Sequence, residues 1–154
     1  MKITHFHEIE AEFIQRVHTM VWCSVATIDA QNRPRSRVLH PIWEGATGWI
    51  GTGRHTHKAK HLDANPYLSL AYIADVMSPV YVDCKAEWIE EAAEKERIWE
   101  LFRTTPEPLG YDPAMTFGSL EHFGLLKLTP WRIDLVTFPA PSMEEGTKVW
   151  RNEV

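Results

Sequence analysis

The chain has 154 residues, 44% of them hydrophobic, which is enough for one buried core and too little for two. We therefore expect a single domain over residues 1–154. The formal net charge of −5 argues against nucleic acid as a partner, because phosphate backbones favour a broad basic surface. No run reaches the roughly 18 apolar residues of a membrane span, and the N-terminus lacks the apolar core of a signal peptide. These features favour a cytoplasmic protein without a membrane partner.

Hydrophobic patterning predicts the order of the elements. An amphipathic helix is predicted over residues 6–18, where Phe6, Ile9, Phe13 and Val17 recur at spacings of three and four. Runs of β-branched and aromatic residues predict strands over residues 20–28, 33–43, 49–52, 67–74, 79–89 and 125–138. Further helices are predicted over residues 55–64 and 90–103, with a short helical piece after Asp112-Pro113. Residues 149–150 either add an edge strand or pack on a partner.

The number and linkage of the strands indicate the fold class. About six strands with short hairpin links favour a mainly β fold, a closed or half-closed antiparallel barrel with peripheral helices, over a parallel α/β sheet. Cys23 and Cys84 lie among apolar neighbours inside two of these strands. Because cysteines in a chain without a secretion signal are more often buried thiols than disulfide partners, we expect two free thiols in the barrel.

The segment from residue 33 to residue 66 carries the chemistry of an anion site. Arg33, Arg35 and Arg37 alternate along a predicted strand and therefore project from one face. Arg33 and Arg35 fit a solvated edge equally well. Arg37 is the cation nearest to the apolar Val38-Leu39 pair, so it can enter a pocket and fork onto a phosphate or carboxylate.

The helix predicted next begins with Thr56, His57 and Lys58, after a strand that ends in Gly51-Thr52-Gly53. A helix N-terminus offers unpaired N–H groups and a partial positive charge, to which Thr56 adds a hydroxyl and Lys58 a full charge. Together these groups suit a dianionic phosphate. Thr56 as a simple N-cap and Lys58 as a surface residue are the alternatives.

Two histidines on the same predicted helix raise the question of a metal. His57 and His61 form an i, i+4 pair that could hold an ion from one helical face. No acidic or cysteine ligand accompanies the pair in the sequence, so phosphate contact or a solvated surface explains these side chains better. We expect no metal site.

The order and spacing of these residues resemble the pyridoxamine 5'-phosphate oxidase-like family of FMN-binding split barrels. The matching positions are a strand core at Arg37-Val38-Leu39-His40, a strand end at Gly51-Thr52, a helix start at Thr56-His57-Lys58, and a close at Leu62 and Asn65-Pro66. The similarity continues more loosely through Val80–Trp88 and Pro130-Trp131, so it covers most of the chain.

The resemblance implies a six-stranded antiparallel split β-barrel that forms a homodimer with two FMN molecules at the interface. It assigns Arg37 and Lys58 to the phosphate, together with the helix start at Thr56 and His57. It assigns Val38, Leu39, His40, Gly51 and Thr52 to the isoalloxazine ring and ribityl chain. Trp131 either reaches the flavin of the neighbouring subunit or fills the barrel rim.

Two departures from the family pattern indicate a non-classical branch. His57 stands where many relatives have arginine, which implies a weaker, pH-dependent phosphate contact. The tail reads Val149-Trp150-Arg151-Asn152 and lacks the family's C-terminal Arg-x-His substrate motif, which argues against pyridoxamine phosphate as the substrate. His40 either hydrogen-bonds the flavin ring or is a barrel histidine satisfied by the protein.

The resulting expectation is an FMN-dependent oxidoreductase that moves hydride between the flavin and a small molecule. The cofactor carries that chemistry, so no catalytic side chain is assigned. No glycine elbow or Ser-His-Asp arrangement suggests nucleophilic catalysis. The alternatives are a non-catalytic flavin- or haem-binding or sensing protein, and a deazaflavin-dependent reductase, because the fold does not fix the function.

Overall fold

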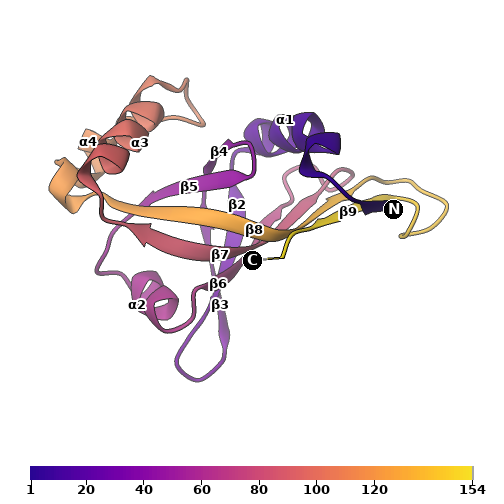
Figure 1. The fold of residues 1–154 in the computed structure, drawn as a ribbon, viewed down its shortest axis with the longest axis horizontal. Helices are drawn as coiled ribbons and strands as arrows, with labels where there is room; N and C mark the ends of the chain where they lie inside the picture. Colours follow the sequence, from indigo (N-terminus) through magenta and orange to yellow (C-terminus); the bar gives the residue numbers. More distant parts are fainter. Residues whose placement is uncertain (154) are drawn as a thin grey trace.

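The computed structural model describes residues 1–153 and shows one strongly curved sheet flanked by helices (Figure 1). The strands are β1 (Lys2–Ile3), β2 (Cys23–Ile28), β3 (Pro34–Leu39), β4 (Ile42–Glu44), β5 (Thr47–Thr52), β6 (Tyr67–Tyr72), β7 (Val80–Ile89), β8 (Gly124–Val136) and β9 (Thr147–Arg151). The helices are η1 (Phe6–Glu8), α1 (Glu10–Met20), α2 (His57–Ala64), α3 (Ala92–Thr104), α4 (Pro113–Phe117) and η2 (Leu120–His122). The expected mainly β fold with peripheral helices is confirmed.

The sheet differs from the prediction in its strand number and in its direction. It has nine strands in the described part of the chain instead of six, along the path β1-β9-β8-β7-β6-β2-β3 with β5 and β4 branching from β8. It is mixed because β1 pairs with β9 in parallel, while the other pairs are antiparallel. β3 and β4 do not pair with each other, so the barrel stays open on that side. β1 has two residues and is too short for periodicity to predict it, whereas β9 confirms the edge-strand alternative for residues 149–150.

The strand predicted over residues 33–43 is wrong as a single strand. β3 ends at Leu39, and β4 begins at Ile42 and pairs with β5 instead of β2. Pro41 has no N–H to donate to a ladder and restricts His40 before it, so the strand is interrupted there. The chain therefore crosses the open side of the barrel at His40-Pro41.

The main core fills the concave side of the sheet, and α1 closes it. Phe13 and Val17 of α1 are fully buried, and the helix packs on β4 and β7. The ring of Phe13 meets that of Trp43 edge to face at 5.1 Å, and the indole N–H of Trp43 donates to the hydroxyl of buried Tyr72 at 2.9 Å. This helix runs to Met20, so the strand predicted from residue 20 begins three residues later.

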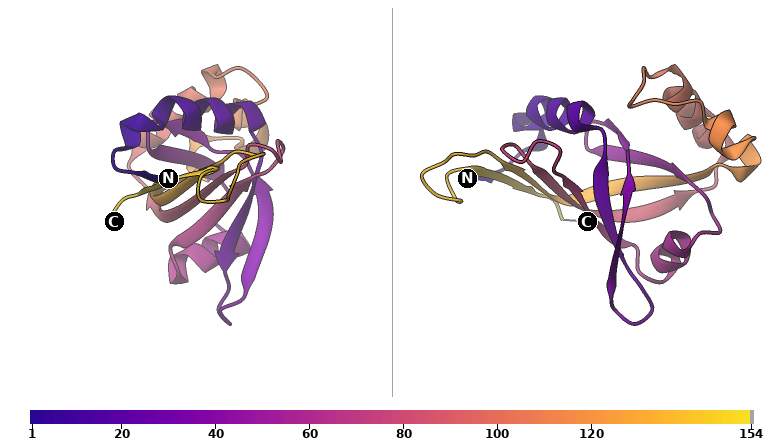
Figure 2. Two further views of the ribbon diagram at one scale, coloured as in Figure 1. Left: turned by 90° about the vertical axis from the view of Figure 1, so that its right-hand side faces the viewer. Right: turned by 180° about the vertical axis from the view of Figure 1, so that it is seen from behind.

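Residues 90–123, which contain α3, α4 and η2, form a separate cover over one end of the sheet, at the opposite end from β1 and β9 (Figures 1 and 2). We call this segment the helical cover. It has its own apolar cluster, in which Ile98, Phe102 and Phe123 pack with Ile42 and Trp49 of the sheet.

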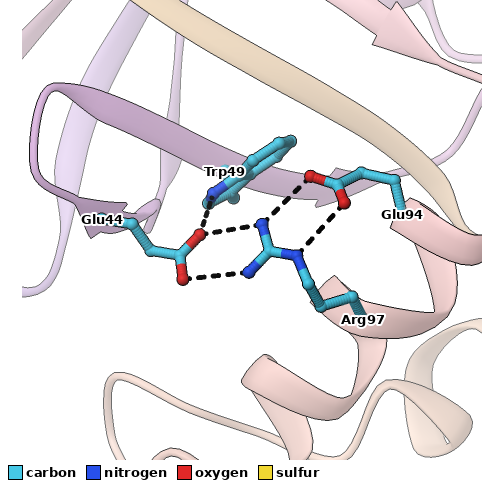
Figure 3. A network of polar contacts seen from close by, with 4 residues as sticks. All are labelled: Glu44, Trp49, Glu94 and Arg97. Atoms are coloured by element: carbon cyan, nitrogen blue, oxygen red, sulfur yellow. Dashed lines mark hydrogen bonds and ion pairs between the residues drawn. The ribbon is translucent and has the colours of Figure 1, made fainter.

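A polar network fixes the helical cover to the sheet (Figure 3). The guanidinium of Arg97 on α3 donates to both carboxylate oxygens of Glu44 at 3.0 and 3.1 Å and to those of Glu94 at 3.0 and 3.1 Å. Glu44 also accepts the indole N–H of Trp49 at 2.8 Å. These contacts lower the pKa of Glu44, with the Arg97 hydrogen bonds as the largest cause. The cover is therefore held by apolar packing and by charge together.

The remaining expectations agree with the structure within a few residues at the element ends. The helix at residues 57–64 is capped by Thr56, and the short helix after Asp112-Pro113 is capped by Asp112. Val149-Trp150 lies in β9, which pairs with β8 and β1. Cys23 and Cys84 are free and buried, and burial raises the pKa of the Cys23 thiol to about 12. Within residues 1–153, no helix combines the length and the apolar character that a membrane crossing requires.

Candidate functional site

Two basic side chains meet beside the start of α2. Lys58, in the first turn of α2, is only 8% exposed, and its ammonium group donates to the hydroxyl of Thr52 at the end of β5. Arg37, on β3, is half-buried, and its guanidinium donates to the carbonyl of Val25 at 3.2 Å and to the hydroxyl of Thr27 at 2.6 Å. We call Arg37 and Lys58 the cation pair.

The cation pair carries uncompensated positive charge. Burial and the nearby charge of Arg37 lower the pKa of Lys58 to about 8. Burial and the charge of Arg35 lower the pKa of Arg37. Within residues 1–153, neither member of the pair forms a salt bridge with a carboxylate. Two desolvated cations without an acid between them are an arrangement that a bound anion would stabilise.

Local sequence explains how the cation pair is positioned. Thr56 accepts the N–H of Ala59 at 3.2 Å and donates to the carbonyl of Gly53 at 3.1 Å, so it is the N-cap of α2. With the helix start fixed, Lys58 faces the sheet. On β3, Arg37 pairs with Val25 of β2 and shares the inner face with Leu39, whereas Val38 is on the outer face.

A cavity of about 240 Å³ lies where the chain crosses the open side of the barrel, next to β3 and β5. β3, β5 and the segment after β3 contribute Val38, Leu39, His40, Ile50 and Gly51 to its wall, and all of these except Ile50 are site residues predicted from the sequence. The helical cover contributes three more, namely Tyr111, Thr116 and Phe117. We call it the cover cavity. Its volume is below the roughly 300–1,000 Å³ of pockets that hold a whole ligand, so it suits one part of a larger molecule.

His40 is one of the polar residues in the wall of the cover cavity. Its ring lies between those of Trp22 and Tyr111, at centroid distances of 4.3 and 5.2 Å. Its Nδ1 is buried without a hydrogen-bond partner among the described residues. Burial lowers its pKa, and the Leu109 carbonyl opposes that effect only in part. Because this nitrogen has almost no accessible surface, only the accessible part of the half-buried imidazole can contact a ligand in the cavity.

The backbone at Gly51 lies tightly against the helical cover. A Cβ placed there would collide with the ring of Phe123 and lie 2.7 Å from the hydroxyl of Tyr111. Only glycine lets β5 approach the cover this closely. Gly51 therefore sets how closely β5 and the helical cover approach each other at the edge of the cover cavity.

Other residues from the sequence prediction lie elsewhere. His57 is exposed and faces a cleft of about 290 Å³ between α2 and the β2–β3 turn. Arg33 and Arg35 are exposed, which agrees with the alternative of a solvated edge. They line the same cleft. Trp131 is half-buried on β8, at the register shift opposite Asp83 and Cys84, and lines neither the cover cavity nor that cleft.

Sequence reasoning missed the contribution of the helical cover to the site. Trp22, Tyr111, Thr116 and Phe117 surround His40 or line the cover cavity, yet none was a candidate. The number of aromatic residues in residues 99–123 was the available signal, because a cover of this size needs fewer rings for its own packing.

The chain is similar in sequence to known proteins. A family model described as "Pyridoxamine 5'-phosphate oxidase" matches residues 7–112. General stress protein 26 of Bacillus subtilis (strain 168) is 31% identical over 80 residues, which are 49% of this chain and 56% of that protein. The chain thus matches little more than half the length of this curated relative.

Many solved structures share the fold, and three of them are compared with this chain. A protein from Clostridium acetobutylicum related to general stress protein 26 has a TM-score of 0.72 at 13% identity, with 94% of each chain covered. An FMN-binding protein related to pyridoxamine 5'-phosphate oxidase, from Nostoc punctiforme PCC 73102, has a TM-score of 0.64 at 13% identity, with 99% of this chain and 98% of that chain covered. HutZ, the heme storage protein of Vibrio cholerae, has a TM-score of 0.58 at 20% identity, with 79% and 89% covered. At these identities the likeness concerns the fold alone.

Proposed function

The chain belongs to the pyridoxamine 5'-phosphate oxidase family, and from this premise and the uncompensated charge of the cation pair we propose that it is an FMN-dependent oxidoreductase. The observation that carries the proposal is that Arg37 and Lys58 are desolvated together and that neither forms a salt bridge with a carboxylate within residues 1–153. A phosphate dianion supplies the missing charge and accepts a forked hydrogen bond from the guanidinium.

The other parts of the site suit the other parts of FMN. The cover cavity begins beside Gly51, and Thr52, the next residue on β5, accepts from Lys58. A phosphate at the cation pair and a ring in the cover cavity would therefore be joined along the end of β5. The half-buried imidazole of His40 would contact the ring from the cavity wall. When bound, FMN supplies hydride transfer, and the protein supplies binding, orientation and exclusion of water.

The first test is the cofactor itself. Purified protein should be yellow with the two absorption bands of oxidised flavin, and mass spectrometry of the released ligand should identify FMN and distinguish it from a deazaflavin. A colourless protein that takes up no added FMN would contradict the proposal. Turnover is tested by anaerobic mixing with NADH or NADPH, because flavin that stays oxidised with every donor tried favours a binding or sensing protein.

Haem binding is the second candidate, and one observation favours it. Burial lowers the pKa of His40, which lines a cavity with Tyr111 and Phe117, and neutral imidazole is the form in which histidine ligates iron. The absorption spectrum of the purified protein separates the candidates, since haem gives one intense Soret band. His40→Ala should abolish haem binding and should only weaken FMN binding.

We also propose a homodimer formed by the outer face of the sheet. The register aligns Val38, Ser24, Ala71 and Tyr81 in one row across β3, β2, β6 and β7. Val38 is 64% exposed and Tyr81 is 41% exposed, with small side chains between them. Apart from Ser24 and the Tyr81 hydroxyl the row is apolar, and it borders the cover cavity through Val38, so a second copy would both bury it and adjoin the site.

Light scattering at micromolar concentration tests the dimer. The wild-type protein should have twice the mass of the chain, and Tyr81→Asp should shift it toward the monomer. Met143→Asp is the matched control, because Met143 is 60% exposed in the loop between β8 and β9 and belongs neither to the row nor to the wall of the cover cavity. A monomeric wild-type protein would overturn this proposal.

A further inference from the structure

We propose that the cleft between α2 and the β2–β3 turn is a second phosphate-binding subsite, which takes a nucleotide phosphate next to the one held by the cation pair. We call it the basic cleft. The inference extends the proposed flavin site, but it rests on its own residues. The basic cleft has a volume of about 290 Å³.

The walls of the basic cleft come from α2, from β3 and from the β2–β3 turn. His57, Lys60 and His61 lie on one face of α2, at the spacing of three and four residues that a helix face requires. Arg35 lies on β3, on the same face as Arg37, and Arg33 lies in the turn just before β3. The basic groups therefore face one another across the cleft from a helix and from a strand pair.

The charge of the basic cleft is positive and largely unpaired. Asp29 is the one acidic residue in the wall, and it is occupied by its own turn. Its carboxylate accepts the backbone N–H groups of Gln31 and Arg33 at 2.9 Å and the side chain of Arg33 at 3.0 Å. Among residues 1–153, Arg35 and Lys60 have no carboxylate partner. Two free cations face one cleft in a chain whose net charge is −5, so the charge is concentrated locally.

The basic cleft and the cation pair share a wall. Nδ1 of His61 lies 2.9 Å from the hydroxyl of Thr27, and that hydroxyl accepts from Arg37 at 2.6 Å. Arg35 and Arg37 are two residues apart on one strand face, which separates their Cα atoms by about 7 Å. An anion in the cleft would therefore be a neighbour of the phosphate at the cation pair, within reach of one ligand or of two ligands side by side.

Two kinds of molecule could carry the phosphate that binds in the basic cleft. The second phosphate belongs either to the adenylate half of a flavin dinucleotide, bound through the same flavin site, or to a separate adenine nucleotide such as the electron donor. In both cases Arg35 and Lys60 donate to phosphate oxygens, and the apolar parts of Ala64 and the arginine stems offer a surface for the attached nucleoside.

Calorimetric titration of the full chain with FMN, FAD and ADP tests the proposal. The double variant Arg35→Gln/Lys60→Gln removes both free charges, and Lys95→Gln on α3 is the control for loss of a lysine elsewhere. If the phosphate belongs to the adenylate half of a flavin dinucleotide, the double variant should bind FAD at least tenfold more weakly than wild type. Its affinity for FMN should stay within about threefold of wild type. If the phosphate belongs to a separate adenine nucleotide, the double variant should bind ADP at least tenfold more weakly than wild type. Its affinities for FMN and FAD should then change by equal and small factors.

Two results would overturn the second subsite. One is a double variant that binds FMN, FAD and ADP as wild type does. The other is a loss shared equally by FMN and the larger ligands, which would mean that Arg35 and Lys60 act only through the cation pair. A wild-type protein that binds ADP but not FMN would contradict the proposed function while leaving the subsite standing, so the two failures are distinguishable.

Discussion

Replacing Lys58 by methionine should stabilise the cofactor-free protein and weaken its binding of FMN. The side chain is only 8% exposed, and its pKa is about 8 instead of the ordinary 10.5. At about 1.4 kcal/mol for each pKa unit, holding the ammonium charged in this site costs about 3 kcal/mol at neutral pH. Methionine fills similar space without the charge, and losing the hydrogen bond to Thr52 offsets about 1 kcal/mol of the gain.

The expected result is a gain of about 1–3 kcal/mol in the unfolding free energy of the cofactor-free protein, measured by urea denaturation. The dissociation constant for FMN, measured by flavin fluorescence, should rise by about 10- to 150-fold, because a hydrogen bond from a charged group contributes about 1.5–3 kcal/mol. Lys95→Met is the matched control and should leave FMN binding unchanged.

The same reasoning fixes a pH dependence. Because the pKa of Lys58 is lowered in the folded state, the unfolded chain binds more protons between pH 8 and pH 10.5. This group therefore destabilises the folded protein fully below about pH 8, and the penalty is relieved as the pH rises to about 10.5. The Lys58→Met variant should lack this component. A variant that is less stable than wild type and binds FMN equally well would refute the argument on both counts.

Three further changes test the frame around the site. Arg97→Ala should reduce stability by about 1 kcal/mol or less, because its bridge to Glu44 is roughly half exposed and screened; a loss above about 3 kcal/mol by urea denaturation would contradict that estimate. Tyr72→Phe should cost about 1–3 kcal/mol in the same assay, since the buried indole N–H of Trp43 loses its acceptor, and an unaltered midpoint would argue against that hydrogen bond. Gly51→Ala should cost about 1–3 kcal/mol and weaken FMN binding, because its Cβ would collide with the helical cover, whereas wild-type stability and affinity would mean that the cover yields freely.

Local pattern was sufficient for most elements and for the cation pair. The helix over residues 57–64 is set by the Thr56 cap at one end and by Asn65-Pro66 at the other, and these signals lie within the segment itself. Arg37 and Lys58 were identifiable because each lies beside apolar or helix-start residues in the sequence. Their shared desolvation could not be identified in this way, since it depends on the packing of β3, β5 and α2 around them.

Pairing between distant segments decided the features that pattern reading missed. The strand predicted over residues 33–43 reads as continuous, but after Pro41 the chain pairs with β5 instead of β2. An edge strand at residues 149–150 is one alternative that the sequence offers, but its parallel pairing with β1, from the opposite end of the chain, has no local signal.

The sequence by itself determined the mainly β class, the family resemblance and the residues that suit a phosphate, because composition, capping and alternation act over a few neighbouring residues. Only the tertiary structure decided that the helical cover closes a cavity over His40 and that Arg35 and Lys60 face one cleft. The physical reason is that burial and the loss of solvent around a charge are properties of three-dimensional neighbours. The rings of His40 and Tyr111 are neighbours in space, but β4, β5, α2, β6, β7 and α3 separate them in the sequence.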